Sequence, residues 1–233
     1  MIKKAMILAA GFGKRMHPLT LDCPKPLLKI HEGTLLSNTI KFLQKIGVEK
    51  IVINVHYLAS QIIKYIDKKN FNVEIIIEEE KDNILDTGGG ILNVLSHFLN
   101  EPFITINPDT LWNSDYLKEF KLMEKVFFSS KDNSCCMLVV SKEKSFDKSL
   151  KGDFNLEKNM INKKNNLNYI YTGLQIIRPE VFLNSDEKIF SINKIWNTLI
   201  KNNKLCGIDS NINFLHINNV NVYKDLMDKN FKH

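Results

Sequence analysis

The sequence predicts an α/β fold, in which helices flank a mostly parallel central sheet within a single domain covering residues 1–233. Two observations predict this fold. Apolar runs of strand length alternate along the chain with segments whose apolar residues recur at helical spacing, which is the pattern of βαβ units. The chain has 233 residues, of which 44% are hydrophobic and 25% are charged, so it is long enough to bury a substantial core.

The first half of the chain contains four predicted strands, each an apolar run that ends in a polar or glycine-rich loop. They lie at 5–9, 51–55, 73–77 and 103–106. Segments with one apolar face predict helices between these strands, at 35–46, 58–66 and 91–99. Gly47 follows the first of these helices, and glycine commonly closes a helix in the left-handed conformation.

The second half of the chain shows the same patterns with a longer polar interruption. It contains predicted strands at 134–140 and 169–177 and predicted helices at 191–202 and 221–227. Between the two strands, residues 141–168 are polar and rich in lysine and asparagine. This stretch predicts either a flexible excursion or a lid.

The formal net charge of the chain is +6, but the lysines that produce it are scattered. Because no basic cluster is interleaved with aromatic residues, the charge gives no reason to expect a nucleic-acid partner. The cations best placed for binding, Lys14, Arg15 and Lys25, lie in one short region near the N-terminus. This grouping indicates that the ligand is a compact anion rather than a polymer.

Four cysteines, Cys23, Cys135, Cys136 and Cys206, show no CxxC spacing and no accompanying histidine pattern. Neither a zinc site nor a disulfide framework is therefore indicated. Cys135 and Cys136 lie in an apolar run and are expected in the core. The apolar stretch 5–10 is too short for a signal peptide or a membrane span, which predicts a cytoplasmic protein with no membrane partner.

A glycine-rich turn, AAGFGKRM at residues 9–16, follows the first predicted strand. Ligands bind at the carboxyl ends of strands in open α/β sheets, and glycines allow backbone N–H groups to form a concave anion site. Two common phosphate-binding motifs do not fit. A dinucleotide fingerprint needs glycine at Met16, and a Walker loop needs serine or threonine at Arg15.

A proline-flanked lysine and a strand-end carboxylate complete the candidate site. Pro24 and Pro26 restrict the backbone on both sides of Lys25, so its ammonium group is held in one direction. The predicted strand 103–106 delivers Asn107 and Asp109 to the same sheet edge as the glycine turn. Lys25 and Asp109 are therefore expected to face one cavity, although Asp109 alone also fits a helix N-cap or a turn residue.

These motifs resemble those of a known family. Residues 9–20 and 24–27 (AAGFGKRMHPLT and PKPL) resemble the signature of the sugar-1-phosphate nucleotidyltransferases. The resemblance extends over most of the chain and is nearest to the N-acetylmuramate-1-phosphate uridylyltransferases. The supporting matches are 53–57 (INVHY), 85–91 (LDTGGGI), 107–112 (NPDTLW), 152–154 (GDF) and 171–174 (YTGL).

The resemblance implies a Rossmann-like, three-layer nucleotidyltransferase fold with a mixed, mostly parallel sheet, of the GT-A-like type. It also implies a Mg²⁺-dependent reaction of the EC 2.7.7 type between a nucleoside triphosphate, with UTP favoured, and a sugar-1-phosphate. The acceptor expected first is N-acetylmuramate α-1-phosphate, which gives UDP-N-acetylmuramate and pyrophosphate in cell-wall sugar recycling. A monomer or a small homo-oligomer is expected.

The resemblance also assigns roles to individual residues. The expected catalytic residues are Arg15, Lys25 and Asp109. The expected nucleotide-binding residues are Ala10, Gly11, Gly13, Lys14, Arg15, Lys25, Gly88, Gly89 and Asn107, of which the last three precede a helix or end a strand. The expected sugar-binding residues are Asp153, Thr172 and Gly173. Mg²⁺ is expected on Asp109 and Asn218, since it prefers hard oxygen ligands.

Two positions depart from the family pattern. Pro108 stands where glycine or alanine is more common, and Asn218 stands where this branch has a second metal-binding aspartate. These departures leave open a regulator that binds nucleotide sugars without turnover, and Asn218 also fits a plain loop residue. His17, His56 and His216 are expected to be structural, because phosphoryl-type transfer depends on positioning and charge neutralisation.

The base and the acceptor also stay open. Mannose-1-phosphate guanylyltransferases, glucose-1-phosphate uridylyl- and thymidylyltransferases and phosphocholine cytidylyltransferases share the fold and the signature, and fold does not decide function.

Overall fold

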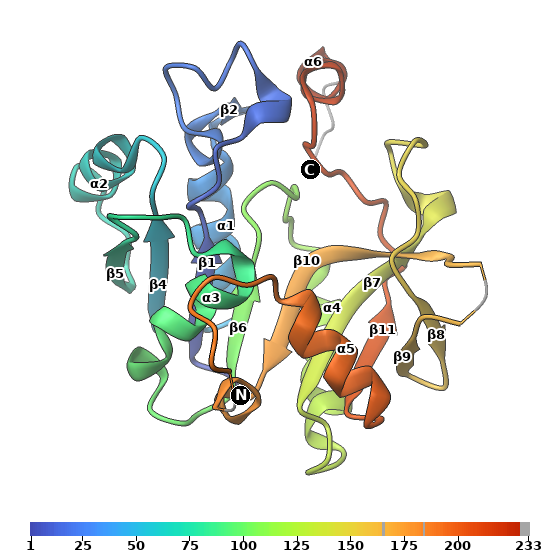
Figure 1. The fold of residues 1–233 in the computed structure, drawn as a ribbon. Coiled ribbons are helices and arrows are strands. Elements are labelled where there is room, and N and C mark those ends of the chain that lie inside the picture. The colour runs from blue at the N-terminus through green and yellow to red at the C-terminus, as the bar shows by residue number, and fades with distance from the viewer. Residues whose placement is uncertain (165, 184, 229–233) are drawn as a thin grey trace.

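A computed structural model describes residues 1–164, 166–183 and 185–228 of the chain (Figure 1). Its strands are β1 (Lys4–Leu8), β2 (Lys29–Ile30), β3 (Gly33–Thr34), β4 (Lys50–Val55), β5 (Glu74–Glu79), β6 (Phe103–Ile106), β7 (Cys135–Ser141), β8 (Asn155–Glu157), β9 (Met160–Asn162), β10 (Tyr169–Ile177) and β11 (Leu205–Asp209). Its α-helices are α1 (Leu35–Lys45), α2 (Ala59–Asp67), α3 (Asp86–Asn93), α4 (Tyr116–Phe128), α5 (Asn193–Lys201) and α6 (Val220–Asp228).

Most of these strands form one mixed sheet in the order β5-β4-β1-β6-β10-β7-β11-β9-β8. The strands β5, β4, β1 and β6 are parallel to one another, and β7 is parallel to β11. Strand β10 is antiparallel to both β6 and β7 and joins the two parallel groups. The short strands β2 and β3 pair separately. The predicted mixed, mostly parallel sheet is confirmed.

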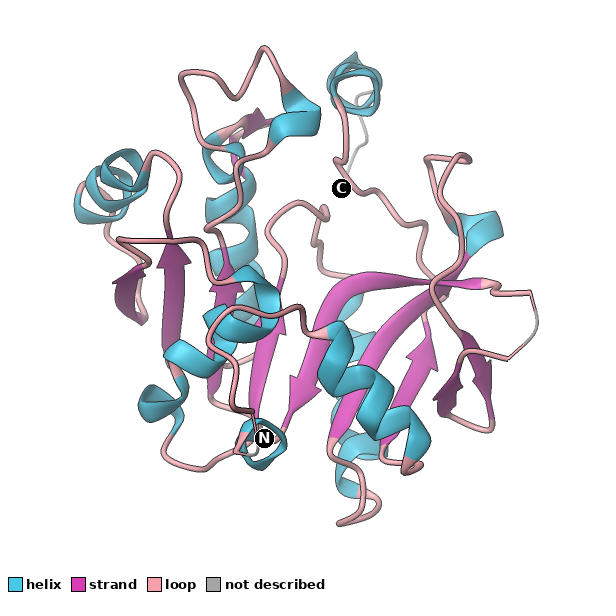
Figure 2. Ribbon diagram, viewed as in Figure 1, coloured by secondary structure: helices cyan, strands magenta, loops and turns pink. Residues whose placement is uncertain are grey.

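Helices cover both faces of this sheet (Figure 2). Helices α1, α2 and α4 pack on one face, where they contribute Leu36, Ile40, Ile62, Phe120 and other side chains to the largest apolar cluster. Helices α3 and α5 pack on the opposite face over a second cluster that includes Ile91 and Trp196. The result is the predicted arrangement of three layers.

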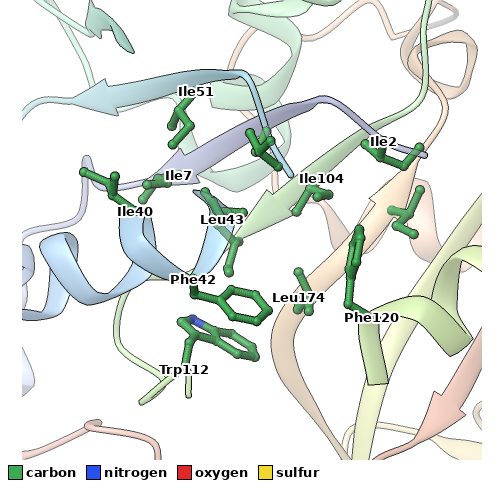
Figure 3. Close-up of a cluster of buried hydrophobic side chains, with 14 of the residues drawn as sticks. Ile2, Ile7, Ile40, Phe42, Leu43, Ile51, Ile104, Trp112, Phe120 and Leu174 are labelled. Atoms are coloured by element: carbon green, nitrogen blue, oxygen red, sulfur yellow. The ribbon is translucent and has the colours of Figure 1, made fainter. Parts of the chain in front are cut away.

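The larger cluster fixes the position of the loop that follows β6. The rings of Phe42 and Trp112 stack with centroids 5.5 Å apart, below Leu43 and beside Leu174 in the view of Figure 3. Trp112 also donates a hydrogen bond from its indole nitrogen to the backbone oxygen of Asn107, at 3.0 Å. This aromatic anchor therefore holds the segment between Asn107 and Trp112 against the sheet.

Local signals explain where the first helix begins. The Thr34 hydroxyl accepts a hydrogen bond from the backbone N–H of Ser37, and the Ser37 hydroxyl accepts one from the backbone N–H of Thr34. This capping box satisfies two N–H groups that otherwise lack helical partners. Helix α1 then buries Leu36, Ile40 and Leu43 on one face, as its spacing predicts.

Most of the predicted elements are found within a few residues of their predicted bounds, and those at 103–106 and 169–177 coincide with β6 and β10. The prediction for residues 141–168 was wrong in part. Its described residues contain the hairpin β8–β9, and β9 pairs with β11 at the edge of the sheet. Because Ile161 and Phe154 are buried, this stretch is packed onto the domain instead of extending from it.

Three parts of the fold were not predicted. Helix α4 buries Tyr116, Phe120, Met123 and Phe127, a spacing typical of an amphipathic helix. Strand β11 is a short apolar run that contains a glycine, and β2 and β3 have only two residues each.

Cys135, Cys136 and Cys206 are buried, which confirms the core placement expected for the adjacent pair. Among the described residues, no helix combines the length and apolarity that crossing a bilayer requires.

Candidate active site

A cavity of about 430 Å³ opens at the carboxyl ends of β1, β4 and β6, between the glycine turn and the loop after β6. Its lining comes from segments that are distant in sequence. The residues are Leu8, Ala9, Ala10, Gly11, Gly13, Lys14, Arg15, Met16, Lys25, Pro26, Leu35, Asn54, Glu80, Ile84, Asp86, Thr87, Asn107, Pro108, Asp109 and Asn218. The structure therefore brings together most of the residues that the sequence predicted for nucleotide and metal.

The glycine turn has a conformation that requires glycine at one position. Gly13 has a φ of 64°, in the left-handed region that side chains disfavour. A Cβ atom there would also lie 3.2 Å from the Lys25 Cβ and 3.3 Å from the Thr20 Cγ2. The carbonyl of Gly13 accepts hydrogen bonds from Met16 N–H and from the Thr20 hydroxyl. Gly13 thus lets the turn pack directly against the segment that carries Lys25.

A second set of contacts holds the chain between this turn and Lys25. The Tyr57 hydroxyl lies 2.8 Å from the carbonyl oxygen of Thr20 and 2.9 Å from that of Leu21. Gln61, in α2, donates from its amide to the carbonyl of Asp22 at 2.9 Å. The match at 53–57 therefore has a structural reason, since Tyr57 ties the long cation-bearing loop to the end of β4.

Lys25 and Asp109 line one cavity, as the sequence predicted, and their side chains are in direct contact, which it did not predict. The Lys25 ammonium lies 2.5 Å from Asp109 Oδ2, and the two side chains are 14% and 19% exposed. Lys25 begins a short 3₁₀ helix, η2 (Lys25–Leu27), and the extended Pro24 precedes it. An ion pair of this kind is screened little by salt, because water is largely excluded from it.

Asp109 is held in its charged form. Burial by itself would raise its pKa, but the Lys25 ammonium, and to a smaller extent His216, lower the pKa of Asp109 to about 2. His216 places its Nδ1 3.5 Å from Asp109 Oδ1 and is 19% exposed, and burial is the main cause that lowers its pKa below the ordinary value. The His216 ring stacks on Phe214 with centroids 5.4 Å apart. The structural role expected for His216 stays a prediction.

The lowered pKa of Asp109 predicts a loss of stability in acid. A carboxyl group with a pKa of about 2 in the folded protein and about 4 in the unfolded chain stabilises the fold above pH 4. That contribution, about 2.7 kcal/mol, is lost progressively as the pH falls from about 5 to 1. We expect the unfolding free energies of wild type and Asp109→Asn, measured in urea, to approach each other by this amount over that range. A difference independent of pH would contradict the expectation.

The donor set around Asp109 fits a hard divalent cation. Asp109 Oδ1 is buried and makes no hydrogen bond among the described residues, and His216 Nδ1, 3.5 Å away, is likewise unpartnered among them. Asn218, 5% exposed, lines the same cavity and carries an amide oxygen. In the part of the chain that the structure describes, no three His, Cys, Asp or Glu side chains converge as a metal cluster. Mg²⁺ typically binds one or two protein oxygens together with substrate phosphates and water, which these residues match.

Asn107 supports the cavity floor through its backbone. Its N–H donates to the carbonyl of Gly173 at 2.8 Å, at a point where β10 shifts register against β7. Gly173 has a φ of 92°, and a Cβ atom there would lie 2.9 Å from the Asn107 Cβ. Glycine at 173 therefore allows β10 to approach the residues that follow β6.

The predicted sugar-binding residues do not line the cavity. Thr172 is buried, and its hydroxyl donates to the carbonyl of Leu138 at 2.8 Å. Asp153 accepts a hydrogen bond from the N–H of Tyr171, and burial is the main cause that raises its pKa above the ordinary value. Gly173 contacts Asn107 as described above. Sugar binding by these three residues stays a prediction.

The predicted placement of the 86–90 run before a helix was wrong. Helix α3 begins at Asp86, so its glycines lie inside the helix. The N–H groups of Gly88 and Gly89 donate to the carbonyl of Phe190, at 2.8 and 3.0 Å. A Cβ atom at Gly89 would lie 2.1 Å from the carbonyl oxygen of Lys188. These glycines allow the 188–190 segment to cross the helix, and Asp86 and Thr87 are the residues of this run that line the cavity.

Two buried polar side chains in the cavity wall were not assigned a role from sequence. Asn54, at the end of β4, accepts a hydrogen bond from the Ala9 N–H and donates to Glu80 at 2.7 Å. Glu80 also accepts a hydrogen bond from the Leu85 N–H at 2.8 Å. Asn54 and Glu80 therefore connect the ends of β1, β4 and β5 to the start of α3. The available signal was an asparagine inside the otherwise apolar run 51–55.

The amino-acid sequence is similar to those of known nucleotidyltransferases. Residues 4–146 match the family model described as nucleotidyl transferase. An N-acetylmuramate alpha-1-phosphate uridylyltransferase of Neisseria meningitidis is 34% identical over 185 residues, which cover 77% of this chain and 77% of the relative. A protein of the same description from Caulobacter vibrioides is 28% identical over 222 residues, covering 92% of this chain and 91% of the relative.

Several solved structures share the fold. HddC from Yersinia pseudotuberculosis superposes with a TM-score of 0.78 at 23% identity, covering 97% of this chain and 99% of that one. The inositol-1-phosphate CTP transferase from T. maritima superposes with a TM-score of 0.79 at 21% identity, covering 98% and 96%. At these identities the superpositions show the fold, which is the predicted three-layer arrangement.

Proposed function

The chain belongs to the family of sugar-1-phosphate nucleotidyltransferases, and from this premise we propose that it joins UTP to a sugar-1-phosphate and releases pyrophosphate. The acceptor that we propose first is N-acetylmuramate α-1-phosphate, with UDP-N-acetylmuramate as the product. The observation that carries the proposal is the contact between Lys25 and Asp109 at 2.5 Å, in one cavity with the glycine turn. This arrangement suits a reaction between two polyanions.

The cations of the cavity have distinct parts in this proposal. An oxygen of the acceptor phosphate attacks the α-phosphorus of the nucleotide in line with the departing pyrophosphate, and no covalent intermediate with the protein is needed. The backbone from Gly11 to Gly13, with Lys14 and Arg15, would hold the pyrophosphate. Lys25 would lie between the acceptor and the α-phosphate and neutralise the charge that both carry.

Asp109 and Asn218 would hold a Mg²⁺ ion, which when bound would supply positive charge at the α-phosphate. The carboxylate of Asp109 is ionised over the physiological range, since its pKa is about 2. Asp109 therefore needs no proton loss before it binds a cation. Pro108 precedes this carboxylate in the cavity lining and leaves it in contact with Lys25.

The proposed substrates rest on the two uridylyltransferase relatives, whose lengths this chain matches over most of their extent. A cytoplasmic role in recycling cell-wall sugars belongs to the same proposal. Guanylyltransferases of mannose-1-phosphate are also among the relatives, but one of them aligns over only 52% of its own length. The coverage therefore favours the muramate acceptor over mannose-1-phosphate.

A matrix of substrates tests the proposal. Purified protein is incubated with each of UTP, GTP, CTP and dTTP against N-acetylmuramate, N-acetylglucosamine, glucose and mannose 1-phosphates, with Mg²⁺ or with EDTA. We expect pyrophosphate release to be highest for UTP with N-acetylmuramate α-1-phosphate and to be abolished by EDTA. Higher turnover with another pair would overturn the substrate assignment. Binding without turnover for every pair would favour the regulator.

A further inference from the structure

The orientation of the Asn218 amide is set by a neighbouring carboxylate. Asn218 Nδ2 donates a hydrogen bond to Asp147 Oδ2 at 2.7 Å. An ionised carboxylate accepts hydrogen bonds and donates none, so the amide nitrogen has to face Asp147. The carbonyl oxygen of Asn218 consequently faces away from Asp147.

A second hydrogen bond fixes that carbonyl oxygen. Asn219 Nδ2 donates to Asn218 Oδ1 at 2.8 Å, and Asn219 Oδ1 accepts the backbone N–H of Val222, in the first turn of α6, at 3.0 Å. An amide oxygen has two acceptor lone pairs. One is used by Asn219, and one is left for a further partner.

The Asp147 carboxylate is itself firmly held. Its Oδ1 accepts hydrogen bonds from the backbone N–H and the hydroxyl of Ser149, at 2.9 and 2.6 Å. One carboxylate oxygen is therefore committed to Ser149 and the other to Asn218.

Backbone hydrogen bonds join the segments that carry these residues. The N–H of Ile217 donates to the carbonyl of Asp109 at 2.8 Å, and the N–H of Phe146 donates to the carbonyl of Phe214 at 2.9 Å. The segment from Phe214 to Asn218 is thereby fixed to both the Asp109 loop and the Asp147 turn. Asp147 is thus linked to the cavity that Asp109 and Asn218 line.

We propose that Asp147 is a positioning residue for the cation bound by Asp109 and Asn218. It turns the Asn218 amide so that the carbonyl oxygen is presented to the cation. Without being a ligand itself, it also supplies, next to Asn218, the negative charge that a second carboxylate ligand would carry. The inference rests on the proposed function for the identity of the cation. It explains how a neutral ligand serves at a position where the family pattern has an aspartate.

The test measures metal affinity without turnover. Binding of Mn²⁺ alone to the purified chain, up to millimolar concentration, is followed by the electron paramagnetic resonance signal of the free ion. We expect Asp147→Asn to raise the Kd for Mn²⁺ about 10-fold or more, the size typical for loss of an outer-sphere partner. Ser149→Ala is the matched control, because it removes a hydrogen bond from Asp147 Oδ1 and leaves Oδ2 on Asn218. It should leave the Kd within about 3-fold of wild type.

A charge exchange tests whether the negative charge of Asp147 supports the cation. The double variant Asp147→Asn with Asn218→Asp keeps the hydrogen bond with its donor and acceptor reversed, and it keeps the net charge. We expect it to bind Mn²⁺ at least as tightly as wild type. Circular dichroism melting of every variant checks that a change in Kd does not come from a loss of the fold.

The possible results distinguish this inference from the proposed function. Unchanged Mn²⁺ affinity in Asp147→Asn would overturn the role of Asp147, even if wild type released pyrophosphate as proposed. No recovery in the folded double variant, or no Mn²⁺ binding by wild type, would also overturn it. A wild-type protein without turnover that nevertheless showed the expected affinities would sink the proposed function and leave the role of Asp147 supported.

Discussion

Lys25→Ala is expected to lower kcat by about 100- to 1000-fold, with a folded protein. The reason is the loss of one preorganised charge at the transferring phosphate, worth roughly 3 to 4 kcal/mol in the transition state. Lys25 is held 2.5 Å from Asp109 and is 14% exposed, so water does not replace its charge at the same position. Pyrophosphate release under saturating substrates measures the effect.

Lys4→Ala is the matched control for this variant. Lys4 is also largely buried, at 16% exposure, and pairs with Glu101 at 2.9 Å, but it lies in β1 outside the cavity lining. It should lose some stability and keep its turnover. Lys25→Met keeps the aliphatic part of the side chain and should be as inactive as Lys25→Ala. Retention of most wild-type activity in Lys25→Ala would remove this lysine from the mechanism.

Asp109→Asn is expected to reduce kcat by a similar factor, about 100-fold or more. The amide preserves the shape of the side chain and removes the carboxylate that pairs with Lys25 in the cavity. The activation by Mg²⁺ should shift to higher concentration as well, since a neutral oxygen binds the ion more weakly. A titration of turnover against Mg²⁺ measures both changes.

Asp115→Asn controls for a change of charge in the same loop, because Asp115 is exposed and its carboxylate lies outside the cavity, where it accepts a hydrogen bond from the Asn113 amide. It should be indistinguishable from wild type. The double variant Lys25→Ala with Asp109→Ala gives a further distinction. If the two residues served only as a structural ion pair, removing both would restore activity relative to either single variant, and we expect no such recovery.

The cavity was predictable because its main parts are local in sequence. The glycine turn at 9–16 and the lysine between two prolines are short motifs that can be recognised in the sequence itself. The strand before Asp109 predicts that this residue lies near them, because the carboxyl ends of parallel strands lie at one edge of the sheet. The placement of Lys25 and Asp109 in one cavity was expected on this basis, whereas their direct ion pair was not. Their contributions to catalysis stay predictions that the variants above address.

The parts that were missed depend on long-range packing. The carbonyl of Phe190 accepts hydrogen bonds from the N–H groups of Gly88 and Gly89. The sequence of the 86–90 run does not indicate that a segment about a hundred residues later packs across it. Asn54 and Glu80 form their hydrogen bond across neighbouring strands, so neither residue alone indicated it. The hairpin β8–β9 is polar where it faces water, and only pairing with β11 reveals it as part of the sheet.

The Lys25–Asp109 ion pair also means that each proposed ligand has to displace a charged group of the protein before it can bind. On the proposed mechanism, a metal ion that approaches Asp109 competes with an ammonium tethered a few ångströms away, and a phosphate that approaches Lys25 competes with the carboxylate. A metal ion bound to Asp109 would free Lys25 for the phosphate, and a phosphate bound to Lys25 would free Asp109 for the metal ion. By linkage the metal ion and the phosphate then increase each other's affinity by the same factor. Each of them therefore binds more weakly to the empty enzyme than to the enzyme that already holds the other.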